Sequence, residues 1–230
     1  MTAHYPEFLE SPKTAMQAPQ TALRSPGRFG PYRSVLKRGL DVGLILLALP
    51  VVLPLILGLA LMVMLDGHSP FYTQARIGRN GRIFRFWKLR TMVHDAEARL
   101  AEHLAGNAEA RAEWHHAQKL KCDPRITRIG LVLRKTSLDE LPQLWNVLRG
   151  EMSLVGPRPM MPEQQHLYPG TAYYSLRPGI TGSWQVADRN ESSFAARAEF
   201  DTAYEETLSF ATDLGILAAT VAVVLRGTGY

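Results

Sequence analysis

Cys122 is the single cysteine in this sequence of 230 residues. An internal disulfide is therefore excluded, and the composition suits a chain that works in a reducing compartment. Neither a Walker A loop nor a G-x-G-x-x-G fingerprint is present, so nucleotide binding by those two routes has no support. Motifs that read bases or bind single strands are also missing, and we therefore expect no nucleic-acid partner.

Acidic residues are missing from two stretches, Ser11–Leu40 and Gly67–His94, although both contain many Lys and Arg residues. The whole chain carries a formal net charge of +5. A basic surface of this kind suits anionic lipid or a phosphorylated substrate, and it is also common on ordinary solvated faces. Because the two basic stretches flank the most apolar part of the chain, a lipid surface is the favoured partner.

That apolar part is Val42–Leu65, 24 residues without a charged or polar side chain. As a helix it would reach ~36 Å, enough to cross a hydrocarbon core of ~30 Å. Pro50 and Pro54 interrupt it, each at a cost of ~3 kcal/mol in a helix interior. A single crossing would also place one basic flank outside the cytoplasm, against the usual tendency of Lys and Arg. The pattern favours a re-entrant hairpin broken at these prolines, with a kinked spanning helix as the alternative.

This segment divides the chain into three parts. Residues 1–33 are rich in proline, small and polar residues, and we expect a disordered tail. We expect residues 34–66 to form the membrane helix and residues 67–230 to form a cytosolic domain large enough to be a catalytic domain. We predict a membrane-associated α/β fold, in which the re-entrant helix precedes a mostly helical domain with a few short strands and interfacial amphipathic helices.

Hydrophobic periodicity locates the elements of the third part. Helices are predicted at His94–Leu120 (one or two), Ile126–Arg134, Leu138–Leu148, Ser193–Leu208 and Leu214–Leu225. The last of these is too short to span a membrane, so we expect it to be buried or interfacial. Strands are predicted at Ile83–Met92, Met152–Val155 and Ser183–Val186. Ser137 and Glu140 have the spacing of a capping box, which places a helix start near Leu138.

Asp139 and Glu140 are adjacent carboxylates at this predicted helix start. Acids at a helix N-terminus commonly serve as caps and as partners of the macrodipole, and spacing alone favours that structural role. The basic residues near the pair in the sequence favour a catalytic or metal-binding role instead. Two carboxylates can bind Mg²⁺ together with a substrate phosphate, and one of them can attack phosphorus.

The basic residues around the pair suit phosphate binding. Arg158 lies between two prolines and Arg177 precedes a Pro-Gly turn, so both guanidinium groups sit on restricted backbone that favours bidentate contacts. Lys88 and Arg90 alternate along the strand at Ile83–Met92, which fits either a phosphate-facing edge or an ordinary basic strand. The candidate phosphate-binding residues are therefore Lys88, Arg90, Arg134, Arg158 and Arg177.

Ordered motifs extend along most of the chain: KR-x-x-D before the apolar run, then Phe86–Met92, Asp123–Arg125, Leu133–Leu144, Met152–Pro159 and Arg177–Val186. From about Ser34 onward the chain resembles the bacterial sugar transferase family, the monotopic polyprenyl-phosphate phosphoglycosyl transferases. Its compact size and the ending Arg226–Tyr230 are most similar to members that transfer galactose phosphate in succinoglycan-type exopolysaccharide synthesis. Where the family has a Ser-Pro break in its membrane helix, this chain has Leu53 before Pro54, and Pro50 is additional.

The resemblance implies an enzyme that transfers a sugar 1-phosphate, galactose or glucose, from a UDP-sugar to undecaprenyl phosphate and releases UMP. This would be the first membrane step of exopolysaccharide synthesis. The resemblance also implies Asp139 as the nucleophile of an aspartyl phosphosugar intermediate and Glu140 as a ligand of Mg²⁺. Lys88, Arg158 and Arg177 fall on basic positions of the family. The implied location is the bacterial inner membrane, with the catalytic domain on the cytoplasmic face and membrane lipid as a partner, and a homodimer is left open.

Two other functions are compatible with the same residues. A glycosyltransferase would move only the sugar and release UDP, and a non-catalytic membrane adaptor would use the basic face to bind lipid or nucleic acid. The nucleotide that is released separates the two enzymes. Substitution of Asp139 separates an enzyme from an adaptor.

Overall fold

The computed structural model describes residues 30–117, 120, 122–187 and 194–225. Most of the predicted disordered tail lies outside the described residues, which include only positions 30–33 of it. Tyr32 and Arg33 already belong to a helical turn, and their side chains bond to the body of the protein. The Tyr32 hydroxyl donates to Asp213 Oδ2 at 2.6 Å, and Arg33 Nη2 donates to Glu205 Oε1 at 2.7 Å.

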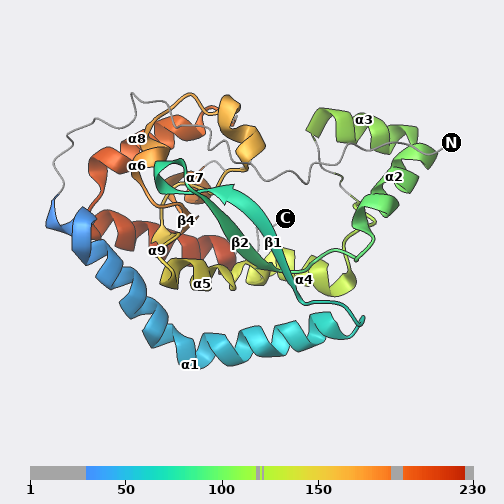
Figure 1. Ribbon diagram of the computed structural model, residues 1–230, viewed down its shortest axis with the longest axis horizontal. Coiled ribbons are helices and arrows are strands. Elements are labelled where there is room, and N and C mark those ends of the chain that lie inside the picture. The colour runs from blue at the N-terminus through green and yellow to red at the C-terminus, as the bar shows by residue number, and fades with distance from the viewer. Residues whose placement is uncertain (1–29, 118–119, 121, 188–193, 226–230) are drawn as a thin grey trace.

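Helices make up most of the described chain (Figure 1). A π-helical turn, η2 (Tyr32–Leu36), continues into the long helix α1 (Lys37–Met64). The other helices are α2 (Ala96–Gly106), α3 (Ala108–Ala117), α4 (Arg128–Thr136), α5 (Gln143–Leu148), α6 (Ala172–Ser175), α7 (Ser183–Val186), α8 (Arg197–Thr207) and α9 (Phe210–Leu225). Short 3₁₀ turns are η3 (Arg79–Gly81), η4 (Leu138–Glu140) and η5 (Pro162–Leu167).

Short strands form two separate pairs among these helices. They are β1 (Phe71–Ile77), β2 (Ile83–Leu89), β3 (Ser153–Val155) and β4 (Gly179–Thr181). The first two form an antiparallel hairpin, and the last two pair in parallel. The structure thus confirms a mostly helical domain with a few short strands.

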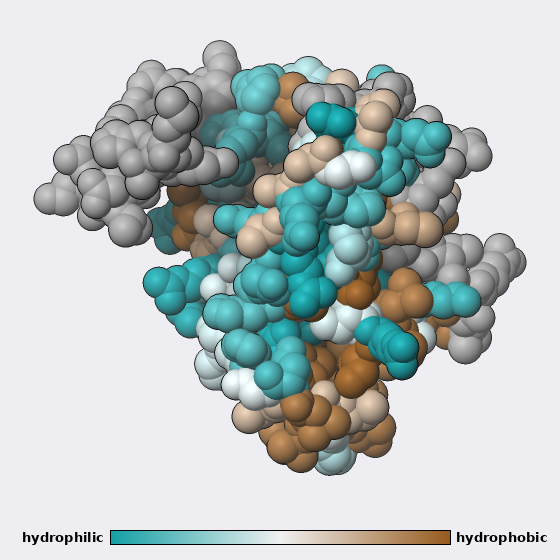
Figure 2. Space-filling model, turned by 90° about the vertical axis from the view of Figure 1, so that its right-hand side faces the viewer, coloured by the Kyte–Doolittle hydropathy of each residue, from teal (hydrophilic) through white to brown (hydrophobic). Residues whose placement is uncertain are grey.

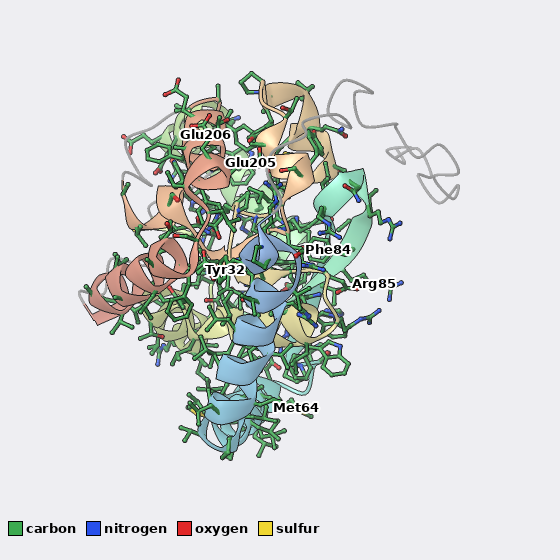
Figure 3. The ribbon with its side chains drawn as sticks, turned by 90° about the vertical axis from the view of Figure 1, so that its left-hand side faces the viewer. Tyr32, Met64, Phe84, Arg85, Glu205 and Glu206 are labelled. Carbon is green, nitrogen blue, oxygen red and sulfur yellow. The ribbon has the colours of Figure 1, made fainter. Side chains whose placement is uncertain are left out.

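The β1–β2 hairpin lies across the middle of the molecule (Figure 1). Its turn holds Asn80 and Gly81 at φ values of 60° and 74°, a backbone region that suits these two residue types. Side chains alternate along β2, so that Phe84 is buried and points into the molecule while Arg85 is exposed and points away (Figure 3). Lys88 is four residues beyond Phe84 and therefore lies on the inner face.

α1 is a continuous helix that bends near its middle, where Pro50 and Pro54 lie (Figure 1). Each proline removes a backbone N–H donor and crowds the preceding turn, which accounts for the bend. Both halves of the helix return to the same body. Ile45 packs in a core cluster with Phe84, Phe86, Val147 and Met152, and Ala60 and Val63 pack in another with Leu89 and Leu133.

The middle of α1 is exposed on the described surface. Among the described helices, the stretch Tyr32–Met64 is long and apolar enough to cross a membrane, by length and composition. Leu47 and Val51 are 78% and 74% exposed, and hydrophobic surface gathers at the end of the molecule formed by α1 (Figure 2). α9 buries Ile216 and exposes Leu214 on another face, as expected of a partly buried or interfacial helix.

The predicted capping box at Ser137 and Glu140 is wrong. Ser137 instead ends α4 in the left-handed region, with φ 57°, and its side chain makes no capping hydrogen bond. Glu140 lies in η4, and α5 begins only at Gln143. A helix that started near Leu138 would need the backbone N–H of residue 142, which Pro142 lacks.

The predicted strand at Ser183–Val186 is also wrong, because these residues form α7 and the strand is β4, just before it. Glycines explain the position of the strand. A Cβ atom on Gly179 would lie 2.1 Å from the Gly156 nitrogen, and one on Gly182 would lie 2.1 Å from the Gly156 carbonyl oxygen. The backbone at Gly156 can approach residues 179 and 182 this closely only because both are glycines, which places the strand at β4.

A buried ion pair fixes the first turn of α1 and gives a stability prediction. Lys37 Nζ lies 2.6 Å from Asp213 Oδ2 on α9, and Asp213 is 1% exposed. Asp213→Ala leaves the buried ammonium without its partner, so we expect it to lower the free energy of unfolding by roughly 3–5 kcal/mol. The measurement is thermal unfolding in detergent, followed by circular dichroism.

The matched control for this prediction is Asp95→Ala. Asp95 pairs with Arg99 at 3.2 Å on the surface, where both side chains are half exposed or more. Exposed pairs of this kind contribute little to stability, so the unfolding midpoint should not change. Equal midpoints for the two variants would contradict a structural role for the Lys37–Asp213 pair.

Candidate active site

Asp139 and Glu140 lie on η4, the short turn between α4 and α5. Ser137 changes the chain direction at the end of α4, where its backbone N–H bonds to the carbonyl of Arg134. The turn presents the two carboxylates together. Asp139 is buried, with 5% of its surface exposed, and Glu140 is half-buried.

Lys88 reaches both carboxylates from the inner face of β2. Its Nζ lies 3.2 Å from Asp139 Oδ2 and 2.8 Å from Glu140 Oε1. These residues are about fifty positions apart in the sequence, and the hairpin brings them together. Two adjacent carboxylates repel each other in a partly buried place, and one ammonium between them offsets that repulsion.

The electrostatics of Asp139 combine opposing effects. Burial raises the pKa of the Asp139 carboxyl above its ordinary value, and the Lys88 ammonium opposes that rise. The neighbouring Glu140 carboxylate raises the pKa further, whereas the Arg134 guanidinium lowers it. The carboxyl is thus held in a partly desolvated place where its charge depends on two cations, an environment typical of catalytic groups.

Arg134 is the second cation of this site. Its Nε donates to Thr91 Oγ1 at 2.9 Å, a residue just beyond β2, and burial lowers the pKa of its guanidinium. The helix α4 and the segment after β2 are therefore joined next to the carboxylate pair. Gly130 allows this contact, since a Cβ there would lie 2.0 Å from the Thr91 carbonyl oxygen.

Asn146 fixes the position of β2 relative to α5, and sequence reasoning missed it. It is fully buried, accepts the Trp87 backbone N–H at 3.2 Å, and donates to the Arg85 carbonyl at 2.7 Å. The same amide nitrogen donates to Glu151 Oε2 at 2.7 Å. Asn146 thus holds the strand residue next to Lys88. The signal that points to it is a lone amide inside the apolar run Leu144–Leu148.

Arg90 does not lie at the carboxylate pair. Its Nη1 and Nη2 lie 2.7 Å and 2.6 Å from the two oxygens of Asp66, and Nη2 also donates to the Val63 carbonyl at 3.3 Å. The expected alternation with Lys88 ends with the strand at Leu89. Arg90 therefore ties the far end of α1 to the segment that follows β2.

Arg177 is held at the other end of α5. Its Nε donates to the Gly150 carbonyl at 3.0 Å, and Arg38 donates to the carbonyls of Val147 and Leu148 nearby. Burial lowers the pKa of Arg177, and the neighbouring Arg79 and Arg38 lower it further. These basic side chains bond to the carbonyl end of a helix, where cations are favoured.

Arg158 is exposed and lies beside Trp184 of α7, with its Cζ 5.9 Å from the ring centroid. The structure therefore brings together Asp139, Glu140, Lys88 and Arg134, and it places Arg90, Arg158 and Arg177 at three other positions. The sequence predicts Trp184 only as part of a strand. No pattern in the sequence indicates its contact with Arg158.

The carboxylate pair has a donor set that fits Mg²⁺. Both side chains supply hard oxygen ligands, and they already hold a cation, the Lys88 ammonium, between them. Among the described residues, no group of three or more His, Cys, Asp or Glu side chains could hold a metal ion. Mg²⁺ commonly takes one or two carboxylates, with waters and substrate phosphate as the other ligands, so two protein ligands are enough.

Comparison with known proteins places the chain in a family. Residues 32–227 match the model of the family described as bacterial sugar transferase. The UDP-galactose-lipid carrier transferase of Erwinia amylovora is 48% identical over 196 residues, which are 84% of this chain and 41% of that protein. The exopolysaccharide production protein ExoY of Sinorhizobium fredii is 43% identical over 223 residues, which are 94% of this chain and 99% of that protein.

A third relative is the undecaprenyl-phosphate galactose phosphotransferase of Salmonella typhimurium, 44% identical over 84% of this chain and 41% of that protein. The chain thus spans about two fifths of two of these relatives and nearly all of ExoY. The family match covers most of the sequence. The chain belongs to the bacterial sugar transferase family.

The buried amide of Asn146 gives a prediction that is independent of chemistry. Asn146→Ala removes three hydrogen bonds and leaves the Arg85 carbonyl and the Trp87 N–H without these partners, so the free energy of unfolding should fall by roughly 1–3 kcal/mol. The Trp87 N–H should also exchange faster with deuterium in mass spectrometry. Asn107→Ala, which removes a bond to the Ala110 N–H on α3, is the control and should leave β2 exchange unchanged.

Proposed function

We propose that the chain transfers a sugar 1-phosphate from a UDP-sugar to undecaprenyl phosphate and releases UMP, as the first membrane step of exopolysaccharide synthesis. The observation that carries this proposal is the contact of Lys88 with both Asp139 and Glu140 in a partly buried site. The names of the relatives support the substrate classes, since they include a UDP-galactose-lipid carrier transferase and an undecaprenyl-phosphate galactose phosphotransferase. Galactose or glucose is the proposed sugar.

In the first half-reaction, an Asp139 oxygen attacks the β-phosphorus of the UDP-sugar. The new bond joins that oxygen to phosphorus, and the bond from phosphorus to the oxygen bridging the two phosphates breaks, so UMP leaves. The product on the protein is an aspartyl phosphosugar. Burial makes Asp139 poorly solvated and its carboxylate therefore more reactive, the charges of Lys88 and Arg134 favour its charged form, and the Lys88 contact orients it.

In the second half-reaction, a phosphate oxygen of undecaprenyl phosphate attacks the same phosphorus. The bond between phosphorus and the Asp139 oxygen breaks, which restores the carboxylate and yields a lipid diphosphate sugar. Mg²⁺ held by Asp139 and Glu140 would neutralise negative charge on the phosphoryl oxygens. Lys88, next to both carboxylates, is placed to contact the transferring group as well.

We also propose that α1 is a re-entrant membrane hairpin on the cytoplasmic face of the bacterial inner membrane. Its two ends are fixed to one body by the Lys37–Asp213 and Arg90–Asp66 pairs, while its apolar middle is exposed. Exposed apolar side chains on three other helices would lie at the lipid surface beside it. They are Leu131 and Val132 on α4, Trp145 on α5, and Leu214 and Val221 on α9.

The chemical proposal is tested with a UDP-sugar labelled in the β-phosphate, supplied without lipid. We expect label on the wild-type protein, no label on Asp139→Asn, and labelling of Glu140→Gln with a weaker dependence on Mg²⁺. Asp95→Asn is the control at an exposed carboxylate distant in sequence, and it should label like the wild type. Label that survives Asp139→Asn, or release of UDP instead of UMP, would refute the assignment.

The membrane proposal is tested by cysteine accessibility. Ser34 and Ser69 are exposed and flank α1, so each can be changed to cysteine in a Cys122→Ser background. In a re-entrant hairpin both positions face the cytoplasm, and an impermeant maleimide should label neither in intact spheroplasts and both after permeabilisation. Labelling of one position in intact spheroplasts would show a spanning helix instead.

A further inference from the structure

Arg76, Arg158 and Arg197 lie close enough for their charges to interact, and two of them lie beside Trp184. Arg197 Cζ lies 4.2 Å from the Trp184 ring centroid, and Arg158 Cζ lies 5.9 Å from the same ring. Arg76 Cζ lies 5.3 Å from the Phe86 ring on the inner face of the hairpin. We call these three residues the arginine cluster. They come from β1, the loop after β3, and α8, so the fold assembles them from distant parts of the sequence.

The arginine cluster has no salt bridge within the described chain, although the charges of Asp201 and Glu163 act on Arg197 and Arg76. None of the three guanidinium groups forms an ion pair with a described Asp or Glu. Burial lowers the pKa of Arg197 to about 10, and the nearby charge of Arg158 adds to this effect. Asp201, an acid near Arg197, accepts a hydrogen bond from the Tyr168 hydroxyl at 2.9 Å.

Two donors of the arginine cluster are buried without a hydrogen-bond acceptor among the described residues. They are the Nε atoms of Arg76 and Arg197. The Nη atoms of Arg76 do have acceptors, Gln74 Oε1 at 2.7 Å and the Pro159 carbonyl at 3.4 Å. Buried donors without acceptors are rare and costly, and guanidinium groups match phosphate oxygens in geometry as well as in charge.

The arginine cluster is linked to the carboxylate pair through one aromatic ring. Phe86 has the Arg76 guanidinium 5.3 Å from its centroid and the Lys88 ammonium 5.6 Å from it. Lys88 in turn contacts Asp139 and Glu140. Arg76 therefore lies within reach of the carboxylate pair, with the buried Phe86 ring between its guanidinium and the Lys88 ammonium.

The helix α8, which carries Arg197, lies at the upper left of the molecule, whereas the bend of α1 lies at the bottom (Figure 1). A lipid phosphate would arrive from the side of α1, whereas a water-soluble nucleotide can approach from the side of α8. This arrangement favours the donor over the acceptor as the ligand of the cluster.

We propose that Arg76, Arg158 and Arg197 bind the α-phosphate of the donor, the phosphate that leaves with the nucleotide, and that Trp184 is the aromatic surface that positions two of the guanidinium groups. This proposal rests on the proposed function for the identity of the donor. It adds Arg76 and Arg197 as binding residues, and it assigns the ligand class, a nucleoside diphosphate. UMP, the leaving product, would occupy the same place.

The test measures UDP binding to the detergent-solubilised full chain by calorimetry. Arg76→Gln and Arg197→Gln should each raise the Kd for UDP by about tenfold or more, since each removes a charge-assisted contact. Arg85→Gln is the matched control, because Arg85 is exposed on the outer face of the same hairpin, and its Kd should equal that of the wild type. Arg158→Gln repeats the measurement at an exposed position, where loss of folding is not expected. Wild-type UDP affinity in these cluster variants would overturn the proposal.

A second measurement separates the two sources of phosphate. Phosphosugar-enzyme is isolated from each variant and mixed with undecaprenyl phosphate, and the rate of lipid-product formation is followed. We expect wild-type rates for the cluster variants in this step. Slower lipid transfer together with unchanged UDP binding would assign the cluster to the acceptor and overturn our proposal.

The two proposals can fail independently. If the wild-type protein formed no labelled intermediate, the proposed function would fail, while a loss of UDP affinity in Arg197→Gln would still support the nucleotide site. If labelling required Asp139 but UDP affinity did not depend on the cluster, the proposed function would stand and the nucleotide site would fail. The UDP measurement is also made on Asp139→Asn, where binding does not depend on chemistry.

Discussion

The structure depends on one electrostatic constraint, the placement of two adjacent carboxylates in a partly buried turn. Asp139 and Glu140 repel each other, and the burial of Asp139 leaves little water to screen that repulsion. Lys88 resolves the conflict, but only if β2 is held against α5. Asn146 supplies that restraint through hydrogen bonds to the backbone on both sides of Phe86. A hairpin, a turn and a short helix thus have to be positioned together.

Basic residues of similar sequence character have different structural roles. Arg90 pairs with Asp66 and Arg38 bonds to carbonyl oxygens at the end of α5, so both are committed to holding the fold together. Arg158 and Arg197 lie beside an aromatic ring and form no salt bridge with a described acid. The difference lies in what each guanidinium contacts. A basic residue with its donors already satisfied is a weak candidate for substrate binding, whereas one with an unsatisfied donor is a strong candidate.

Some features of this fold follow from the sequence because they depend on neighbouring residues. The apolar length of α1, its bend at the prolines, the short strand after Met152 and the separate helices between His94 and Leu120 are of this kind. Asp139 and Glu140 also stood out, because adjacent acids amid basic residues are visible in the sequence itself. The bridging role of Lys88 depends on a contact across about fifty residues, and periodicity placed it only on a strand.

Other features could not be predicted because tertiary contacts decide them. Four residues such as Ser183–Val186 fit a strand or a helical turn equally well, and the close approach of Gly156 to Gly179 selects the alternative strand. Arg177 resembles a substrate-binding residue in its turn, but its place is determined by the Gly150 carbonyl. The convergence of Arg76 with Arg197 has no local signature, since β1 and α8 meet only in three dimensions.

The packing of α1 on the rest of the protein has a consequence for its solubility in water. Because only a few residues at each end of the helix pack on the body, most of its apolar surface, from Leu46 to Leu65, stays exposed. Leu46, Leu47, Val51 and Leu57 lie on that stretch and contribute nothing to the described cores. Polar replacements there would leave the packing of the ends intact. The chain is therefore suited to redesign as a water-soluble protein that keeps its carboxylate pair in place.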